Sequence, residues 1–147
     1  MGIMESIDIG ANALKVHGKR IDVHAKNIAN LDTPNYVRKI PVLNATDDIS
    51  FHGLMNSMKE DVYGVGSLPY LHGGVSFSGV VEDPTLGEKI YQPGHPDADE
   101  NGYIRHSNVN AMVDIADALM AQRAYEANLA LVNITKTMAQ RAVEIGR

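Results

Sequence analysis

The chain contains no cysteine and no tryptophan, and aromatic residues make up only 5% of its 147 positions. Without cysteine, neither a disulfide framework nor a cysteine-ligated zinc site can form. No apolar run approaches the roughly 20 residues that a membrane-spanning helix needs. The first residues also lack a cationic segment followed by an apolar core, so we expect any export to proceed without a cleaved signal peptide.

Basic residues are too few for a nucleic-acid-binding surface, which needs clustered Lys and Arg. The 13 basic residues face 18 acidic ones, for a formal net charge of -5. Residues 1–35 and 108–147 each carry four basic and four acidic residues, so residues 36–107 hold the whole acidic excess, together with five of the six prolines. We therefore expect a helical arm at 1–35, an acidic β-rich insert at 36–107 and a second helical arm at 108–147.

Both arms carry apolar residues at alternating steps of three and four. This spacing places side chains on one stripe of a helix and is typical of a coiled-coil seam that packs against another helix. The pattern predicts an α+β fold in which long N- and C-terminal helices form a coiled-coil-like pair with a small β-rich insert between them. We expect the arms to fray in a dilute monomer and to become ordered in an assembly. The first stripe comprises Met4, Ile7, Ala11, Leu14, Gly18, Ile21, Ala25 and Ile28, and the second Val113, Ala116, Met120, Ala124, Ala127, Leu131, Ile134, Met138, Ala142 and Ile145.

Helix boundaries follow from the residues that flank the stripes. The first helix is predicted from near Ile7 to about Leu31, because a residue before a proline such as Pro34 is pushed out of the helical region. The last is predicted to begin after Ser107 or Asn108, either of which could act as N-cap, and to end at Ile145 before Gly146. A glycine on the first stripe, Gly18, predicts close approach of a neighbouring backbone.

The insert is predicted to form short strands at 36–43, 75–81 and 89–91, separated by Gly, Pro, Asn and Asp turn signals. Residues 45–74 are harder to interpret. Two alternatives remain open for the segment from Asp47 to Leu71: a short helix near Leu54 to Lys59, or a mobile loop.

One segment resembles the opening of an EF-hand calcium loop. Its twelfth position, which should supply a bidentate Glu, is Asn108, and the prolines before the segment forbid the helix that should lead into the loop. A structural turn is therefore the favoured interpretation, and a weak calcium site or a small metal-dependent binding module is the alternative. The residues that carry the match are Asp97, Asp99, Asn101, Gly102 and Ile104.

The six histidines offer further candidate ligands. His17 and His24 lie seven residues apart on the first helix, and we expect them to face a neighbouring subunit or water. His95 beside Asp97 and Asp99 is a second weak metal candidate. No signature of a nucleophile with its base and oxyanion donors is present. We predict no enzyme activity, no catalytic residue and no cofactor.

Asn27 and Asn30 stand at the predicted end of the first helix, where Asn side chains can satisfy free carbonyls and shape the following turn. Together with the residues that follow them, they resemble the N-terminal signature of the bacterial flagellar rod and hook proteins, and the second half of the chain is similar to the proximal-rod proteins of the C type. The matching segments are 27–30, 32–36 with Arg38, 81–84, 91–99, 102–104, 108–110 and 123–128.

The chain departs from the family pattern at two positions. Ser107 replaces a proline before Asn108, which is compatible with an N-cap but loosens the turn, and Glu126 stands where Gln is common. Neither change removes the aromatic residue of the 123–128 motif, Tyr125. The B-type proximal-rod paralogue is the main alternative within the family.

The resemblance implies a structural subunit of the proximal rod of the flagellar basal body, with the helical arms in the axial core. It implies partners that include other copies and other rod subunits, and export from the cytoplasm by the flagellar type III apparatus. It implies neither membrane insertion nor nucleic-acid binding. The residues expected at subunit interfaces are Leu14, Ile21, Asn27, Ile28, Asn30, Met120, Arg123, Tyr125, Asn128, Leu131, Ile134 and Met138.

Overall fold

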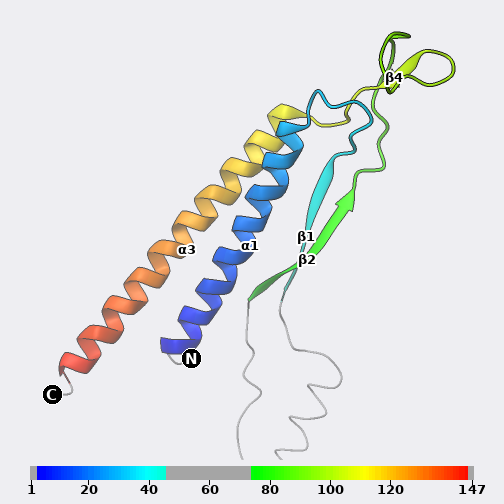
Figure 1. Ribbon diagram of the computed structural model, residues 1–147. Helices are drawn as coiled ribbons and strands as arrows, with labels where there is room; N and C mark the ends of the chain where they lie inside the picture. The colour runs from blue at the N-terminus through cyan, green and yellow to red at the C-terminus, as the bar shows by residue number, and fades with distance from the viewer. Residues whose placement is uncertain (1–2, 46–73, 146–147) are drawn as a thin grey trace, which may run out of the picture.

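The computed structural model describes residues 3–45 and 74–145 and confirms the α+β class, with a long helix at each end of the chain and short strands between them (Figure 1). The segment predicted as a short helix or a mobile loop lies outside the described residues. The elements in chain order are α1 (Ile3–Ala29), β1 (Lys39–Ala45), β2 (Val75–Glu82), β3 (Lys89–Tyr91), β4 (Tyr103–Arg105) and α3 (Ala111–Ile145).

The two helices lie side by side and run in opposite directions, so that the chain termini are at the same end of the pair (Figure 1). At 1.5 Å per residue, the 27 residues of α1 span about 40 Å and the 35 residues of α3 about 52 Å. None of the described helices is both long and apolar enough to cross a membrane.

Helix α1 ends two residues before the predicted Leu31, because Asn30 closes it. The Asn30 side-chain amide donates to the carbonyl of Lys26 over 2.8 Å, and its backbone amide bonds to the carbonyl of Asn27 over 3.1 Å. Asn35 then adopts a positive φ of 60°, which Asn tolerates better than most residues and which turns the chain toward β1. The predicted capping role of Asn30 is confirmed.

The prediction that Ser107 or Asn108 caps the last helix is wrong. Asn110 is the N-cap, because its side-chain oxygen accepts hydrogen bonds from the amides of Met112, at 3.1 Å, and Val113, at 3.2 Å. Asn108 is occupied elsewhere, and the hydroxyl of Ser107 caps only the amide of Val109.

The strands form two separate antiparallel pairs, β1 with β2 and β3 with β4. The β1–β2 pair lies along α1. Its register slips between Val42 and Leu43, where Ser78 is the extra residue of a bulge, and Gly79 beside it takes a φ of 149° that favours glycine. Strand β1 begins at Lys39, three residues after the predicted start, because Tyr36 still belongs to the turn after α1.

The β3–β4 pair stands beyond the end of the helices, at the far tip of the molecule (Figure 1). Tyr91 and Tyr103 face each other across it in an edge-to-face arrangement, with ring centroids 5.2 Å apart. Strand β4 was not predicted, because three residues after an Asn-Gly turn are too few to show an alternating pattern.

The two helices do not pack through the predicted stripes. The face of α3 that meets α1 is a run of mostly small residues that includes Ala118, Ala121 and Val132, and Ala121 is fully buried. The predicted α3 stripe lies about 100° round the helix from Ala121, and its large residues stay exposed, among them Met120 (57%) and Ile134 (61%). Between Ser6 and Ala29 of α1, the buried residues are Gly10, Ala13, Val16, Val23, His24 and Asn27, none of which belongs to the predicted stripe.

The two helices approach closely at Gly10, not at Gly18. A Cβ added to Gly10 would lie 2.6 Å from Cγ2 of Val132 on α3. Among the described residues, a Cβ added to Gly18 would meet no atom within 4 Å, so they do not supply the backbone contact predicted at this position.

These two glycines give a matched pair of substitutions. We expect Gly10→Ala to destabilise the chain by about 1–3 kcal/mol because the helices must move apart, and Gly18→Ala to stabilise it by up to about 1 kcal/mol through helix propensity. Urea unfolding followed by circular dichroism measures both. Equal effects of the two substitutions would contradict the packing described for α1 and α3.

Candidate functional site

The centre of the best-defined polar cluster is a buried carboxylate, that of Asp114 in the first turn of α3. Its side chain is completely inaccessible to solvent. A buried charge is costly unless it is paired and hydrogen-bonded, so its surroundings decide whether the fold tolerates it.

Three side chains from two other parts of the chain meet this carboxylate. Nε of Arg38 donates to Oδ2 over 2.8 Å, while Nδ2 of Asn27 donates to Oδ1 over 2.9 Å. Nδ1 of His24 lies 2.8 Å from Oδ1, and because an ionised carboxylate only accepts, this ring nitrogen carries the hydrogen. Asp114 therefore joins α1, α3 and the segment that leads into β1.

These contacts decide the ionisation of the cluster. Burial alone would raise the pKa of Asp114, but hydrogen bonds from Arg38, His24 and Asn27 outweigh burial and hold the pKa below its ordinary value. The hydrogen bond to Asp114 in turn raises the pKa of Arg38. Asp114 and Arg38 thus form a charged pair at neutral pH.

Asn27 connects the cluster to β1 and to the turn before it through hydrogen bonds. Its amide group donates to the carbonyl of Lys39 over 2.8 Å, and its side-chain oxygen accepts from the amide of Lys39 over 2.9 Å. The same oxygen accepts from the hydroxyl of Tyr36 over 3.1 Å. A fully buried side chain thus hydrogen-bonds both backbone groups of Lys39, the first residue of β1, and fixes where β1 begins.

Asn108 holds the other side of Arg38 through its side-chain oxygen, which accepts from the Arg38 backbone amide. Nδ2 of Asn108 donates to the carbonyl of Thr85 over 2.7 Å. Asp83 adds a longer ion pair to Arg38 of 3.7 Å. Four of the segments that carried the family resemblance therefore meet around one buried carboxylate: 27–30, 32–36 with Arg38, 81–84 and 108–110.

The residues expected at subunit interfaces fall into two groups. Asn27 is buried inside the chain, and Asn30 caps α1; Asn128 donates to the carbonyl of Ala124 within α3 over 2.8 Å. The others lie wholly or partly at the surface: Met120, Arg123, Leu131, Ile134 and Met138 are exposed, and Leu14, Ile21, Ile28 and Tyr125 are half-buried.

The expectation that His24 faces a neighbouring subunit or water is wrong, because His24 is only 3% exposed and bonds to Asp114. His17 is half-buried, and its Nδ1 has no hydrogen-bond partner among the described residues. Burial, with Arg20 nearby, lowers the pKa of His17.

The calcium-loop resemblance belongs to a structural turn. Oδ1 of Asp99 accepts hydrogen bonds from the amides of Asn101, at 2.9 Å, and Tyr103, at 2.8 Å. The carboxylate therefore shapes the turn between β3 and β4, as the turn interpretation predicts. We call residues 89–105, which comprise these two strands and the turn, the tip hairpin. Within the described residues, no group of three or more His, Asp or Glu side chains could hold a metal ion.

Sequence reasoning missed Asp114 and the part that Arg38 plays. A signal was present: Asp114 lies on the same helical face as Ala118, Ala121 and Val132, and a charged residue on an otherwise small and apolar face is a candidate for a paired buried charge. The stronger stripe of large apolar residues next to it hid this face.

Comparison with known proteins matches the two ends of the chain to flagellar families. Residues 7–36 match the family described as flagella basal body rod protein, and residues 100–145 match the family described as flagellar basal body rod FlgEFG protein C-terminal. Whole-length relatives are flagellar basal-body rod proteins FlgC. Those of Bacillus subtilis and of Buchnera aphidicola subsp. Baizongia pistaciae are 32% and 33% identical, and that of Salmonella typhimurium is 29% identical, each aligned over 100% of both chains.

The buried carboxylate of Asp114 and the half-buried one of Asp117, on the same helix, provide a direct test of the cluster. Asp114→Ala should destabilise the chain by about 3–5 kcal/mol, because it leaves Arg38, His24 and Asn27 with unsatisfied buried groups. Asp117→Ala removes only a partly exposed ion pair to Arg38 at 3.7 Å and should cost less than about 1 kcal/mol. Urea midpoints measure both, and similar values for the two variants would refute the assignment.

The lowered pKa of Asp114 also predicts how stability depends on pH. Its folded pKa lies below the unfolded value of about 3.9. The stabilisation is therefore fully present above about pH 4 and is lost as the pH falls through the folded value. When urea titrations are repeated at a series of pH values below about pH 4, the free energy of unfolding of Asp114→Asn should fall less steeply with decreasing pH than that of the unsubstituted chain. Parallel curves for the two proteins would show that Asp114 does not titrate as described.

Proposed function

This chain belongs to the family of flagellar basal-body rod proteins FlgC, and on that premise we propose that it polymerises through its terminal helices as a subunit of the proximal rod. Family membership makes it a structural protein of the basal-body rod. The proposal adds the surfaces through which it assembles, its place in the proximal part and its export by the flagellar type III apparatus.

The exposed stripe of α3 is the main support for assembly through the helices. In α3 only Asp114 and Ala121 are buried, so the 24 residues that follow Ala121 contain no buried side chain. That stretch exposes several large apolar residues on the predicted stripe, including Leu131 (49%), Ile134 (61%) and Met138 (61%). An apolar helix face of this length has no partner within the described part of the chain, and a helix of another subunit would bury it.

The half-buried residues of the α1 stripe, Leu14, Ile21 and Ile28, extend the same argument to the first helix. They lie away from the face that meets β2, so they remain available to a neighbouring helix. We assign the interface to these residues and to Met120, Arg123, Tyr125, Leu131, Ile134 and Met138. Asn27, Asn30 and Asn128 act indirectly, since their side chains fix the chain that carries the interface.

The polar cluster supports a structural role. The side chains of Arg38 and Asp114 hydrogen-bond to each other, and the Asn108 side chain hydrogen-bonds to the backbone of Arg38 and Thr85. Asp114 is also fully buried. This arrangement fixes one end of the helix pair against the strands, as expected of a structural subunit with a rigid shape. Assignment to the C type over the B type rests on the whole-length similarity to FlgC proteins.

Two double substitutions on α3 test the proposed interface. Met120→Asp with Met138→Asp places charges on the exposed stripe, whereas Gln122→Asp with Gln140→Asp adds them two residues further along, about 200° round the same helix. All four positions are exposed, so both variants should keep the stability of the monomer within about 1 kcal/mol.

The readout is incorporation of tagged chain into basal bodies isolated from a host strain that lacks its own copy. We expect the Gln variant to be recovered with the basal bodies and the Met variant to be absent from them. Equal recovery of the two variants would exclude this stripe from the assembly interface.

A further inference from the structure

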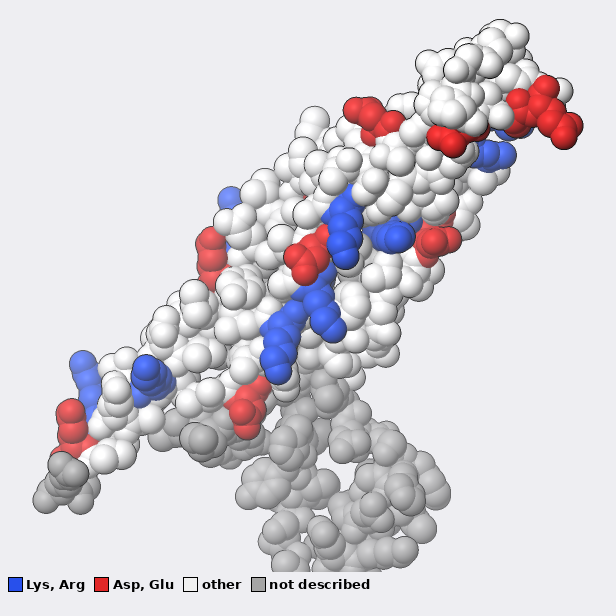
Figure 2. Space-filling model, viewed as in Figure 1, with Lys and Arg blue, Asp and Glu red and all other residues white. Residues whose placement is uncertain are grey.

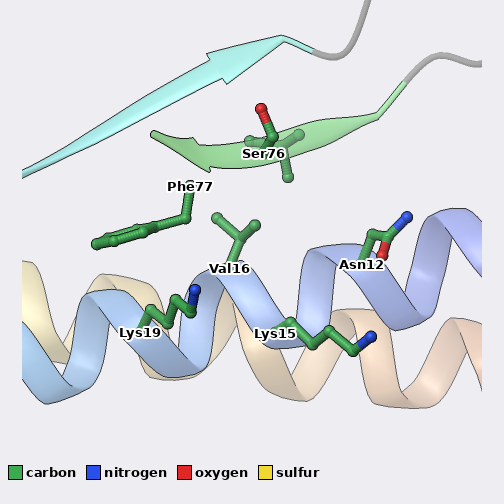
Figure 3. Close-up of a pocket in the computed structure, with 7 residues that line it drawn as sticks. Asn12, Lys15, Val16, Lys19, Ser76 and Phe77 are labelled. Carbon is green, nitrogen blue, oxygen red and sulfur yellow. The ribbon is translucent and has the colours of Figure 1, made fainter. Parts of the chain in front are cut away.

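A shallow groove runs between α1 and β2, away from the α3 stripe. Its volume is about 250 Å³, smaller than the roughly 300–1,000 Å³ of pockets that enclose small-molecule ligands. Figure 3 shows its construction: Val16 of α1 and Phe77 of β2 lie between the two elements, with Asn12, Lys15 and Lys19 along the helix. The groove is large enough for one bulky side chain of a protein partner.

The groove is basic. Lys15 and Lys19 lie one helical turn apart on its rim, and Nζ of Lys19 is 4.9 Å from the ring centroid of Phe77. Among the described residues that line the groove, none is acidic. Lys and Arg side chains gather along the middle of the molecular face in Figure 2, over the helices and the β1–β2 pair. A partner that fits would combine an apolar or aromatic side chain with carboxylates.

The tip hairpin of the same protein has this chemistry. Tyr91 and Tyr103 are 62% and 42% exposed. The hairpin carries three acidic residues, all between residues 92 and 103, and two basic ones in its strands, Lys89 and Arg105, and Figure 2 shows acidic side chains at the tip. Asp99 is used by the turn, but Asp97 and Glu100 are exposed. An isolated two-stranded pair is at best marginally stable in water, so a binding partner would also stabilise this hairpin.

We propose that the tip hairpin of one copy docks into the groove between α1 and β2 of a second copy. The hairpin stands beyond the end of the helices, whereas the groove lies beside the middle of α1, so the two surfaces of one chain are far apart (Figure 1). Because the two surfaces differ, each docked pair leaves one free tip and one free groove, and the contact propagates along an open-ended assembly. This inference rests on the proposed function, to which it adds a second contact outside the helical interface.

Cross-linking tests the contact directly, because the chain has no cysteine of its own. Asn12→Cys, on the exposed helix side of the groove, marks the groove and Asn101→Cys marks the tip, each in a separate full-length chain, with a short bismaleimide as cross-linker. Glu82→Cys, at the end of β2 away from the groove, is the matched control. We expect the mixture of Asn12→Cys and Asn101→Cys chains to give about tenfold more hetero-dimer than the control mixture, since docking raises the local concentration of the tip.

Charge reversal then shows whether the basic groove selects the acidic tip. Lys15→Glu with Lys19→Glu in the groove chain should lower the hetero-dimer yield about tenfold, because like charges now face each other. Adding Asp97→Lys with Glu100→Lys to the tip chain should restore the yield, which a merely unfolded groove chain could not do. Arg20→Glu with Lys26→Glu, an equal charge change elsewhere on α1, should leave the yield unchanged.

Equal yields from the groove and control mixtures, or a groove-reversed chain that cross-links as well as before, would overturn the proposal. A different rod protein as occupant of the groove would also give no Asn12–Asn101 product and so overturn it. If the chain enters basal bodies but gives no such product, the contact between tip and groove is refuted and the proposed function is not.

Discussion

The described fold depends on the pairing of the buried carboxylate of Asp114 with Arg38, His24 and Asn27. The low dielectric of the interior strengthens each of these hydrogen bonds and makes the loss of any one of them expensive. Because the partners come from α1 and from the chain before β1, satisfying one charge fixes the angle of the helix pair and the starting point of the strands. The hydrogen bonds of Asn108 extend this junction to the segment that joins β2 and β3.

The junction lies at one end of the helix pair. We call the end where the Asp114 cluster joins the helices the locked end, and the opposite end, toward the chain termini, the open end. Asp114 is in the first turn of α3, and His24 and Asn27 are in the last two turns of α1. Toward the chain termini, the helices meet through small residues such as Gly10 and Ala121, which contribute little apolar burial. The large apolar side chains of α3 are left outside this contact. A subunit built this way holds its shape at one end and leaves apolar helix faces exposed at the other.

Much of the architecture could be predicted from sequence, because short-range patterns of apolar and turn residues determine it. Apolar periodicity placed both helices, and alternation with turn residues placed three of the four strands. The partner of each helix face was not predictable, since the large-residue stripe through Met120 and Ile134 is a stronger signal than the small-residue face through Ala121 that meets α1. The Asp114 cluster was likewise hidden, because its members are up to 90 residues apart in sequence. Asn27 was singled out for the turn it borders, but only the three-dimensional structure shows that it bonds to a buried charge.

Amide hydrogen exchange on the isolated chain tests the division into a locked and an open end most directly. The account predicts the strongest protection around residues 23–28 and 114–121, beside the Asp114 cluster, and progressively weaker protection toward both chain termini. In assembled rods, the protection of residues 122–145 should rise to match the junction. Protection that is uniform along α3 in the isolated chain, or strongest at its C-terminal end, would contradict the claim that the buried carboxylate holds the helices together.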